Sequence, residues 1–165
     1  MESLKQIQSK IISCELLQKR LAVWRFKDKK IVFTNGCFDI LHLGHIEYLA
    51  KARDMGGVLV VGLNSDDSVH RIKGPSRPLL DEQSRSMALA SLFFIDAVVI
   101  FEEDTPYELI RLVRPDILIK GKDYREEDIV GNDIVKAYGG KVVTMELIKG
   151  YSTTQLIEKM RKLHR

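Results

Sequence analysis

Short apolar segments alternate along this chain with segments of helical pattern, and that alternation limits the folds open to it. Segments such as 43–55 and 81–92 carry apolar residues at helical spacing. The apolar segments between the helical ones are residues 31–34, 58–63, 97–101, 117–120 and 141–145. Alternating strands and helices with short connections give right-handed crossovers and a parallel sheet covered on both faces. The sequence therefore predicts an α/β, Rossmann-like doubly wound fold with a mainly parallel five-stranded sheet.

The N-terminal segment also has a helical pattern. Within residues 1–27, Leu17, Leu21 and Trp24 recur at helical spacing. We therefore expect an N-terminal helical extension at 1–27 and an α/β domain at 28–165. The extension is expected to pack on the domain or on a second subunit. The remaining helices are expected at residues 66–72, 105–114, 129–138 and 153–163.

The composition indicates the setting of the protein. A chain of 165 residues suits one domain with a sizeable core, and no apolar run approaches the roughly 20 residues that span a bilayer. Cys14 and Cys37 show neither metal-ligand spacing nor a disulfide framework, and the first residues lack a secretory signal. The net charge is +3, with acidic and basic residues interleaved. We expect a cytoplasmic protein that binds neither nucleic acid nor membranes.

The stretch after the first apolar segment carries the strongest functional signal. The apolar run ends in the pair Asn35-Gly36, expected as a turn, and His42 and His45 then flank Gly44 where a helix begins. Residues three apart on a helix share a face, so both imidazoles can address one small volume. Free N–H groups at the helix start attract anions there, and Gly44 leaves the space open. The pattern predicts a nucleotide-phosphate site in which both rings donate hydrogen bonds to an α-phosphate.

Two other interpretations of the histidines remain open. Either ring suits an ordinary core or surface position. Asp39, His42 and His45 also have the composition of a metal triad with two histidines and one carboxylate. No outer cluster of ligands supports that triad, so we expect no metal held by protein side chains.

Cations follow the second strand in a loop rich in glycine and proline. Lys73 opens this loop and can reach a β- or γ-phosphate. Arg77 and Arg85 lie within reach of the same region, and either can bind the phosphate of an acceptor through two hydrogen bonds. Taken singly, each of these cations is equally consistent with a solvated surface charge.

Two further segments suit a nucleotide. Ser152, Thr153 and Thr154 begin the last helix, where hydroxyls and free N–H groups form either a second anion cradle or a plain cap. After the fourth apolar segment, Gly121 lets backbone groups approach a base or ribose closely. Asp123 can accept a hydrogen bond from a ribose hydroxyl, although the segment also suits a polar turn.

The remaining polar residues of this region fit two roles. Asn64 and Asp66 suit helix caps as well as ligands, and Cys37 suits packing beside the site. In doubly wound sheets, ligands bind beyond the carboxyl ends of the strands. The loops expected at that edge are residues 35–45, 64–67, 73–78 and 120–124.

Together these residues form a recognisable pattern. The chain resembles the cytidylyltransferase-like nucleotidyltransferases that carry a His-x-Gly-His motif, and among them most closely the adenylyltransferase domains of ADP-heptose synthases. The resemblance runs from about residue 30 to about residue 162. Phe-Glu-Glu-Asp-Thr-Pro and Lys-Gly-Lys-Asp-Tyr make it more specific than His-x-Gly-His alone. The matching stretches are 34–45, 64–66, 73–78, 101–106, 120–124 and 152–154.

The resemblance implies transfer of AMP from ATP, with Mg²⁺, to a sugar 1-phosphate. The implied acceptor is D-glycero-β-D-manno-heptose 1-phosphate, and the products are pyrophosphate and ADP-heptose for lipopolysaccharide core synthesis. A separate sugar kinase and phosphatase would supply the acceptor, and we expect a homo-oligomer, with a dimer favoured. Two alternatives remain: a cytidylyltransferase or FMN adenylyltransferase for another phosphate acceptor, and a non-catalytic nucleotide-binding module.

The expected site residues fall into three groups. The catalytic residues are His42, His45 and Lys73. The residues expected to bind the nucleotide are Asn35, Gly36, Cys37, Phe38, Gly44, Lys120, Gly121, Asp123, Ser152, Thr153 and Thr154. Those expected to contact the acceptor substrate are Asp39, Asn64, Asp66, Arg77 and Arg85.

Overall fold

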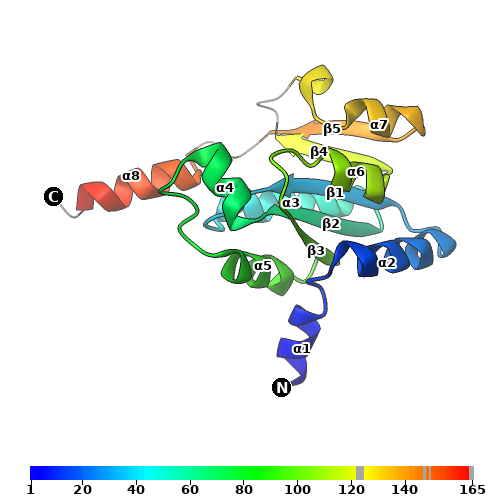
Figure 1. Cartoon of the computed structure of the whole chain (residues 1–165), viewed down its shortest axis with the longest axis horizontal. Coiled ribbons are helices and arrows are strands. Elements are labelled where there is room, and N and C mark those ends of the chain that lie inside the picture. Colours follow the sequence, from blue (N-terminus) through cyan, green and yellow to red (C-terminus); the bar gives the residue numbers. More distant parts are fainter. Residues whose placement is uncertain (122–124, 147, 149, 164–165) are drawn as a thin grey trace.

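Five strands form one sheet in the computed structural model, which describes residues 1–121, 125–146, 148 and 150–163. The order across the sheet is β3-β2-β1-β4-β5, and all neighbouring strands are parallel. The predicted Rossmann-like α/β fold is confirmed (Figure 1). The strands are β1 (Ile31–Gly36), β2 (Val58–Asn64), β3 (Ala97–Phe101), β4 (Ile117–Gly121) and β5 (Lys141–Met145).

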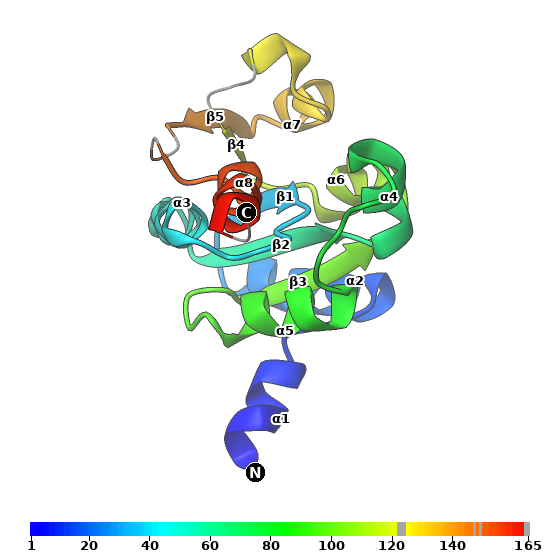
Figure 2. The ribbon, with the colours of Figure 1, turned by 90° about the vertical axis from the view of Figure 1, so that its left-hand side faces the viewer.

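Helices cover both faces of the sheet. Helices α2, α6 and α7 contribute to the apolar layer on one face, and α3 and α5 contribute to the layer on the other. Figure 2 shows α3 and α6 on opposite sides of the strands. The helices are α1 (Glu2–Gln8), α2 (Cys14–Phe26), α3 (Leu43–Asp54), α4 (Asp66–Lys73), α5 (Glu82–Ser91), α6 (Tyr107–Val113), α7 (Asn132–Ala137) and α8 (Thr153–Leu163), with a 3₁₀ turn, η1, at Glu126–Asp128.

The strand sequences explain the two apolar layers. Successive side chains of a strand point to opposite faces of the sheet. Phe33 and Val60 therefore belong to one layer, while Val32 and Leu59 belong to the other, and all four are fully buried. A strand buried on both faces needs an almost continuous apolar run, which is the pattern of the predicted strands.

The order of the strands reverses between β1 and β4. From β1 the chain builds outward through β2 to β3, then crosses back to place β4 and β5 on the other side of β1. Ligands of such sheets bind at this reversal, outside the carboxyl ends of the strands. The loops that follow β1 and β4 are therefore expected to bind the ligand.

Residues 1–27 form the two helices α1 and α2 rather than one continuous helix. Between them the backbone pairs with the edge strand β3. The N–H of Val98 donates to the carbonyl of Lys10 at 2.8 Å, and the carbonyl of Val98 accepts from the N–H of Ile12 at 3.0 Å. The free backbone groups of an edge strand offer these bonds, which a helical spacing in the sequence cannot reveal.

Two other boundaries differ from the prediction. Asn35 and Gly36 continue β1 instead of forming a turn, because they remain paired in register with β2. The helix predicted at 129–138 is reduced to α7. Gly131 lies immediately before α7 with a φ of 84°, a left-handed conformation that does not belong to a helix interior.

Two helices project from the body of the molecule, α1 near the N-terminus and α8 near the C-terminus (Figure 1). In contrast, α2 buries Leu17 and Leu21 in the same apolar layer as the sheet. The domain boundary predicted after residue 27 stays a prediction. Among the described residues, no helix has both the length and the apolar character that crossing a membrane requires.

The burial of α2 predicts the effect of shortening its side chains. Leu17 is 0% exposed, so Leu17→Ala should lower the free energy of unfolding by about 2–5 kcal/mol. Val23 of the same helix is 51% exposed, and Val23→Ala should change it by no more than about 0.5 kcal/mol. Urea denaturation of both variants measures the difference. Small and equal losses would show that α2 lies outside the cooperative core.

Candidate active site

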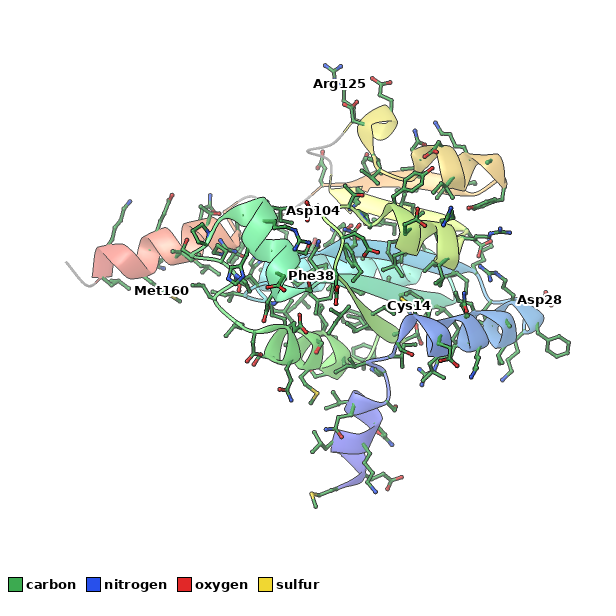
Figure 3. All side chains as sticks on the ribbon, viewed as in Figure 1. Cys14, Asp28, Phe38, Asp104, Arg125 and Met160 are labelled. Carbon is green, nitrogen blue, oxygen red and sulfur yellow. The ribbon has the colours of Figure 1, made fainter. Side chains whose placement is uncertain are left out.

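A cavity of about 490 Å³ lies at the carboxyl ends of β1, β2 and β4. Its wall combines the loops after these strands with the end of α4 and the start of α8. Phe38 and Asp104, both labelled in Figure 3, belong to this wall. The predicted site residues in the wall are Asn35, Gly36, Cys37, Phe38, Asp39, His45, Asn64, Lys73, Arg77, Lys120, Gly121, Thr153 and Thr154.

A larger cavity, of about 750 Å³, lies between α2, α6 and the end of β3. Its described wall contains neither a histidine nor a lysine, and it carries three carboxylates, Glu102, Glu103 and Glu108, beside two arginines. Carboxylates repel phosphates. The smaller cavity also has three carboxylates, Asp39, Asp104 and Asp128, but it adds His45 and three cations, and Asp39 is paired with Arg77. It is therefore the better candidate for binding a nucleotide, despite its size.

The smaller cavity opens where β1 and β4 stop pairing. Strand β1 pairs with β2 along its whole length, but with β4 only at Val32 and Phe33. Beyond that point a hydrogen bond between side chains joins the two strands. The ammonium of Lys120 donates to Oδ1 of Asn35. Two residues predicted to bind the nucleotide are thus bonded to each other in the cavity wall.

His42 and His45 stack at the start of α3. Their ring centroids are 3.8 Å apart, and the ring planes differ by 19°. Nδ1 of His42 accepts a long hydrogen bond, 3.4 Å, from the backbone N–H of His45. A neutral imidazole that accepts at Nδ1 carries its proton on Nε2. His42 therefore keeps one N–H donor for a ligand, next to the His45 ring in the cavity wall.

Burial favours the uncharged form of both histidines. Burial, and next the neighbouring His42 ring, lower the pKa of His45 to about 4, against a smaller opposing effect of the Ile40 backbone. Burial also lowers the pKa of His42. Two neutral rings stack without charge repulsion, and each can donate one hydrogen bond to an anion.

Gly44 and Phe38 hold the histidine pair in place. A Cβ atom on Gly44 would lie 3.1 Å from Nδ1 of His42, so a side chain there would push the ring away. The buried ring of Phe38 meets His45 edge-on, with centroids 5.2 Å apart. Phe38 has a φ of 43°, a left-handed conformation that costs a bulky residue about 1–3 kcal/mol.

Asp39 connects two loops in the cavity wall. Its carboxylate accepts from Nε of Arg77 at 2.5 Å, and from the backbone N–H groups of Leu79 at 2.8 Å and Leu80 at 3.0 Å. The group is almost fully buried and already neutralised. The predicted contact of Asp39 with the acceptor is therefore not supported. Its carboxylate instead orients Arg77.

The same contact weakens the metal interpretation of Asp39, His42 and His45. The Asp39 carboxylate that would have to join the two imidazoles is committed to Arg77. Across the described ranges, no group of three or more His, Cys, Asp or Glu side chains could hold a metal ion.

Three cations supply positive charge to the cavity, namely Lys73, Arg77 and Lys120. Nε of Arg77 donates to Asp39, and the two terminal nitrogens of Arg77 make no hydrogen bond to any described residue. Lys73, at the end of α4, forms no ion pair within the described part of the chain. The cavity is therefore suited to a ligand with several negative charges.

The start of α8 lies beside the start of α3. Thr153 and Thr154 line the cavity, and Oγ of Ser152 caps the helix by accepting from the N–H of Gln155 at 3.2 Å. Cβ of Tyr151 lies 3.5 Å from the position that a Cβ on Gly44 would take. The two helix starts are thus neighbours at the cavity, and the positive ends of both helices favour an anion there.

Arg85 and Asp66 lie outside the cavity wall. Arg85 is 1% exposed. Its guanidinium donates to the carbonyls of Cys37 and Leu80 and to the carboxylate of Asp66. A phosphate could bind Arg85 only by breaking these bonds. The predicted contacts of both residues with the acceptor are therefore not supported.

The wall also contains residues that the sequence interpretation did not include. The hydroxyl of Tyr48 lies 2.7 Å from that of Thr34, a contact without a sequence signal. Asp104 falls in the recognised stretch 101–106, which could have indicated it. Asp123, expected to contact a ribose, lies outside the described residues. The added wall residues are Tyr48, Ile72, Asp104, Thr105, Pro106, Asp128, Ile129 and Val130.

Comparison with known protein families identifies the family of this chain. The model of the cytidylyltransferase-like family matches residues 33–159, which include every predicted site residue. The chain belongs to the cytidylyltransferase-like family. The predicted membership of the chain among the nucleotidyltransferases is thereby confirmed.

Curated relatives extend the similarity towards the N-terminus. Bifunctional protein HldE of Syntrophotalea carbinolica is 56% identical over 155 residues, which cover 94% of this chain and 32% of that protein. Bifunctional protein HldE of Magnetococcus marinus is 51% identical over 151 residues, or 92% of this chain and 31% of that protein. The chain thus spans about a third of the length of these relatives. The matches include part of residues 1–27, which the resemblance seen in the sequence did not reach.

Two solved structures share the fold. The lipopolysaccharide core biosynthesis protein from Thermoplasma volcanium has a TM-score of 0.61 and 32% identity, covering 75% of this chain and 99% of that chain. The pantoate-beta-alanine ligase from Francisella tularensis, complexed with beta-gamma ATP and beta-alanine, has a TM-score of 0.59 over 93% of this chain and 77% of that chain. Its identity is 18%, so it supports the fold alone.

The lowered pKa of His45 predicts how stability depends on pH. The unfolded chain binds a proton near pH 6.5, whereas the folded protein binds it only near pH 4. The free energy of unfolding should therefore fall as the pH falls from about 7 to about 4, by up to about 3 kcal/mol from this residue. Urea denaturation across that range measures the slope.

The variant His45→Asn, which cannot take up the proton, should reduce this slope. His70 on α4 is exposed, and His70→Asn is the matched control that should leave the slope as it is. Equal slopes in the wild type and in His45→Asn would contradict the assignment.

Proposed function

We propose that this protein transfers AMP from ATP to a sugar 1-phosphate and releases pyrophosphate. The proposed acceptor is D-glycero-β-D-manno-heptose 1-phosphate, and the product is ADP-heptose. The observation that carries the proposal is the stacked pair His42 and His45, with centroids 3.8 Å apart beside a cavity that holds three cations. Membership in the cytidylyltransferase-like family and the similarity to HldE proteins support the same reaction class.

In this proposal the α-phosphate of ATP binds between the starts of α3 and α8. Nε2–H of His42 and a ring N–H of His45 donate to its non-bridging oxygens as the phosphorus becomes five-coordinate. Donors already fixed in place before charge develops lower the barrier most, because they need no reorganisation. The neutral state of both rings fits this role, since each ring donates without the energetic cost of burying a charge.

The transfer itself is proposed as a direct in-line displacement. An oxygen of the acceptor phosphate attacks the α-phosphorus, and the bond to the oxygen bridging to the β-phosphate breaks. Pyrophosphate leaves with that electron pair, held by Lys73 and by the hydroxyl and N–H groups of Thr153 and Thr154. Positioning and electrostatics suffice for such a transfer, so no covalent enzyme intermediate is required.

Arg77 is proposed to bind the phosphate of the acceptor. Asp39 binds its Nε, which leaves the two terminal nitrogens of this wall residue for a ligand. Guanidinium and phosphate match in geometry through two parallel hydrogen bonds. Asn64 and Lys120 in the same wall would contact the substrates from β2 and β4.

Mg²⁺ is proposed to accompany ATP. The described side chains form no ligand set for the ion, and Asp39 is committed to Arg77. Phosphate oxygens and water would therefore be its main ligands, as is common for Mg²⁺. The ion would reduce the negative charge of the phosphates, and none of the steps above depends on a protein ligand to it.

We propose a cytoplasmic homodimer whose acceptor is supplied by a sugar kinase activity and a phosphatase activity. Its product would then be used for the core of lipopolysaccharide. The structural neighbour from Thermoplasma volcanium, a lipopolysaccharide core biosynthesis protein, supports the proposed use of the product.

The histidine pair predicts a clear kinetic effect. His42→Ala and His45→Ala should each lower kcat by about 10²–10³, because each removes one preorganised donor. Pyrophosphate release measures kcat, and the thermal midpoint of each variant should change little. His70→Ala, on the exposed side of α4, is the control. A large loss of stability with full activity per folded molecule would favour a structural role for the histidines.

The choice of substrates is tested by pyrophosphate release from ATP or CTP. We expect release from ATP with D-glycero-β-D-manno-heptose 1-phosphate, and little from CTP with the same acceptor. Release from CTP with another phosphorylated alcohol, or from ATP with FMN, would establish a different acceptor. ATP binding without release across a panel of sugar phosphates would identify a nucleotide-binding module instead.

A further inference from the structure

We infer that Arg85 is a positioning residue for the acceptor side of the cavity, although it lines no part of the wall. The inference rests on the proposed function and deepens it. Arg85 joins three segments of the chain, and each of them carries a residue that the proposed reaction uses.

The three segments meet at the guanidinium of Arg85. Nη1 donates to the carbonyl of Cys37 at 2.6 Å, in the loop after β1. Nε donates to the carbonyl of Leu80 at 3.0 Å, in the loop between α4 and α5. Nη2 donates to Oδ1 of Asp66 at 2.7 Å, at the first residue of α4. The rigid fork of a guanidinium fixes the directions of all three bonds at once.

Each segment leads to a residue of the cavity wall. The loop after β1 continues from Cys37 to Asp39, and helix α4 runs from Asp66 to Lys73. The loop between α4 and α5 carries Arg77. The relative positions of Asp39 and Arg77 therefore depend on contacts that meet at one buried side chain, whereas Lys73 lies at the opposite end of α4 from Asp66.

The peptide group of Leu80 is held from both sides. Its N–H donates to Oδ1 of Asp39 at 3.0 Å, and its carbonyl accepts from Arg85 at 3.0 Å. The same carboxylate of Asp39 holds Nε of Arg77 at 2.5 Å. A displacement at Arg85 would therefore reach Arg77 through Leu80 and Asp39, which are contiguous contacts.

Burial makes stability alone a poor explanation for this arginine. The Arg85 side chain is 0% exposed and its partner Asp66 is 31% exposed. A buried ion pair is often no more stabilising than apolar side chains of the same size, because both charges lose their water. A fully bonded polar network does fix a specific geometry. That property is what an acceptor site on two loops requires.

The variant Arg85→Lys tests the inference, because lysine keeps the charge but loses the fork. We expect KM for heptose 1-phosphate to rise at least about tenfold, with KM for ATP and kcat within about threefold of the wild type. Asp66→Asn, which keeps an oxygen acceptor, should give a weaker form of the same pattern. An equal rise of both KM values would overturn the inference.

Arg53→Lys is the matched control. Arg53 pairs with Asp96 at 3.3 Å and donates to the carbonyl of Gly56 at 2.9 Å, near the amino ends of the strands. This variant should alter the thermal midpoint without altering KM for the acceptor. If Arg85→Lys behaves in the same way, Arg85 serves only stability and the inference is overturned.

Amide hydrogen exchange tests the positioning role of Arg85 without any substrate. The N–H groups of Leu79 and Leu80 donate to Asp39, and they should exchange at least about tenfold faster in Arg85→Lys than in the wild type. Amides of β2 should exchange at the same rate in both proteins. If the wild type releases no pyrophosphate with any sugar phosphate, the proposed function fails. The exchange rates alone then decide whether Arg85 fixes the contacts of Leu79 and Leu80 with Asp39. Unchanged rates at Leu79 and Leu80 would overturn the inference.

Discussion

The unequal pairing of β1 with its two neighbours is the constraint on which the site depends. Full pairing with β2 gives β1 a rigid anchor, while the short pairing with β4 leaves the carboxyl ends of the two strands apart. Side chains, chiefly Lys120 and Asn35, bridge the gap instead of backbone bonds. The opening is thus a result of the strand order. Every group proposed to touch a phosphate lies around it.

The chemical character of the opening comes from combining neutral donors with fixed cations. His42 and His45 lie close enough to share a single phosphate group, and burial lowers the pKa of both rings, which favours their uncharged forms. Positive charge is supplied by other residues of the wall, Lys73 and Arg77. This division places short-range hydrogen bonds at the reacting phosphorus and longer-range attraction at the phosphates that must be captured or released.

The parts predicted from sequence are those fixed by local pattern. Strands 97–101 and 141–145 are predicted to the residue. The first is an apolar run between Asp96 and Glu102, and the second begins directly after the pair Gly139-Gly140 and ends before Glu146. The proximity of His42 and His45 follows from a spacing of three on a helix. The position of Arg85 does not follow in this way. Its partners lie 5, 19 and 48 residues away along the chain, so only the assembled fold shows that its guanidinium is already occupied. The break between α1 and α2 is similar, since it depends on hydrogen bonds to a distant edge strand.

That break has a consequence for how copies of the protein can associate. The segment around Ile11 occupies the outer edge of β3 near its start, where it uses both backbone groups of Val98. An incoming strand from another molecule would first have to peel this segment away, so the chain blocks growth of the sheet on that side. The start of β3 is therefore not available for edge-to-edge pairing unless residues 10–12 are first displaced.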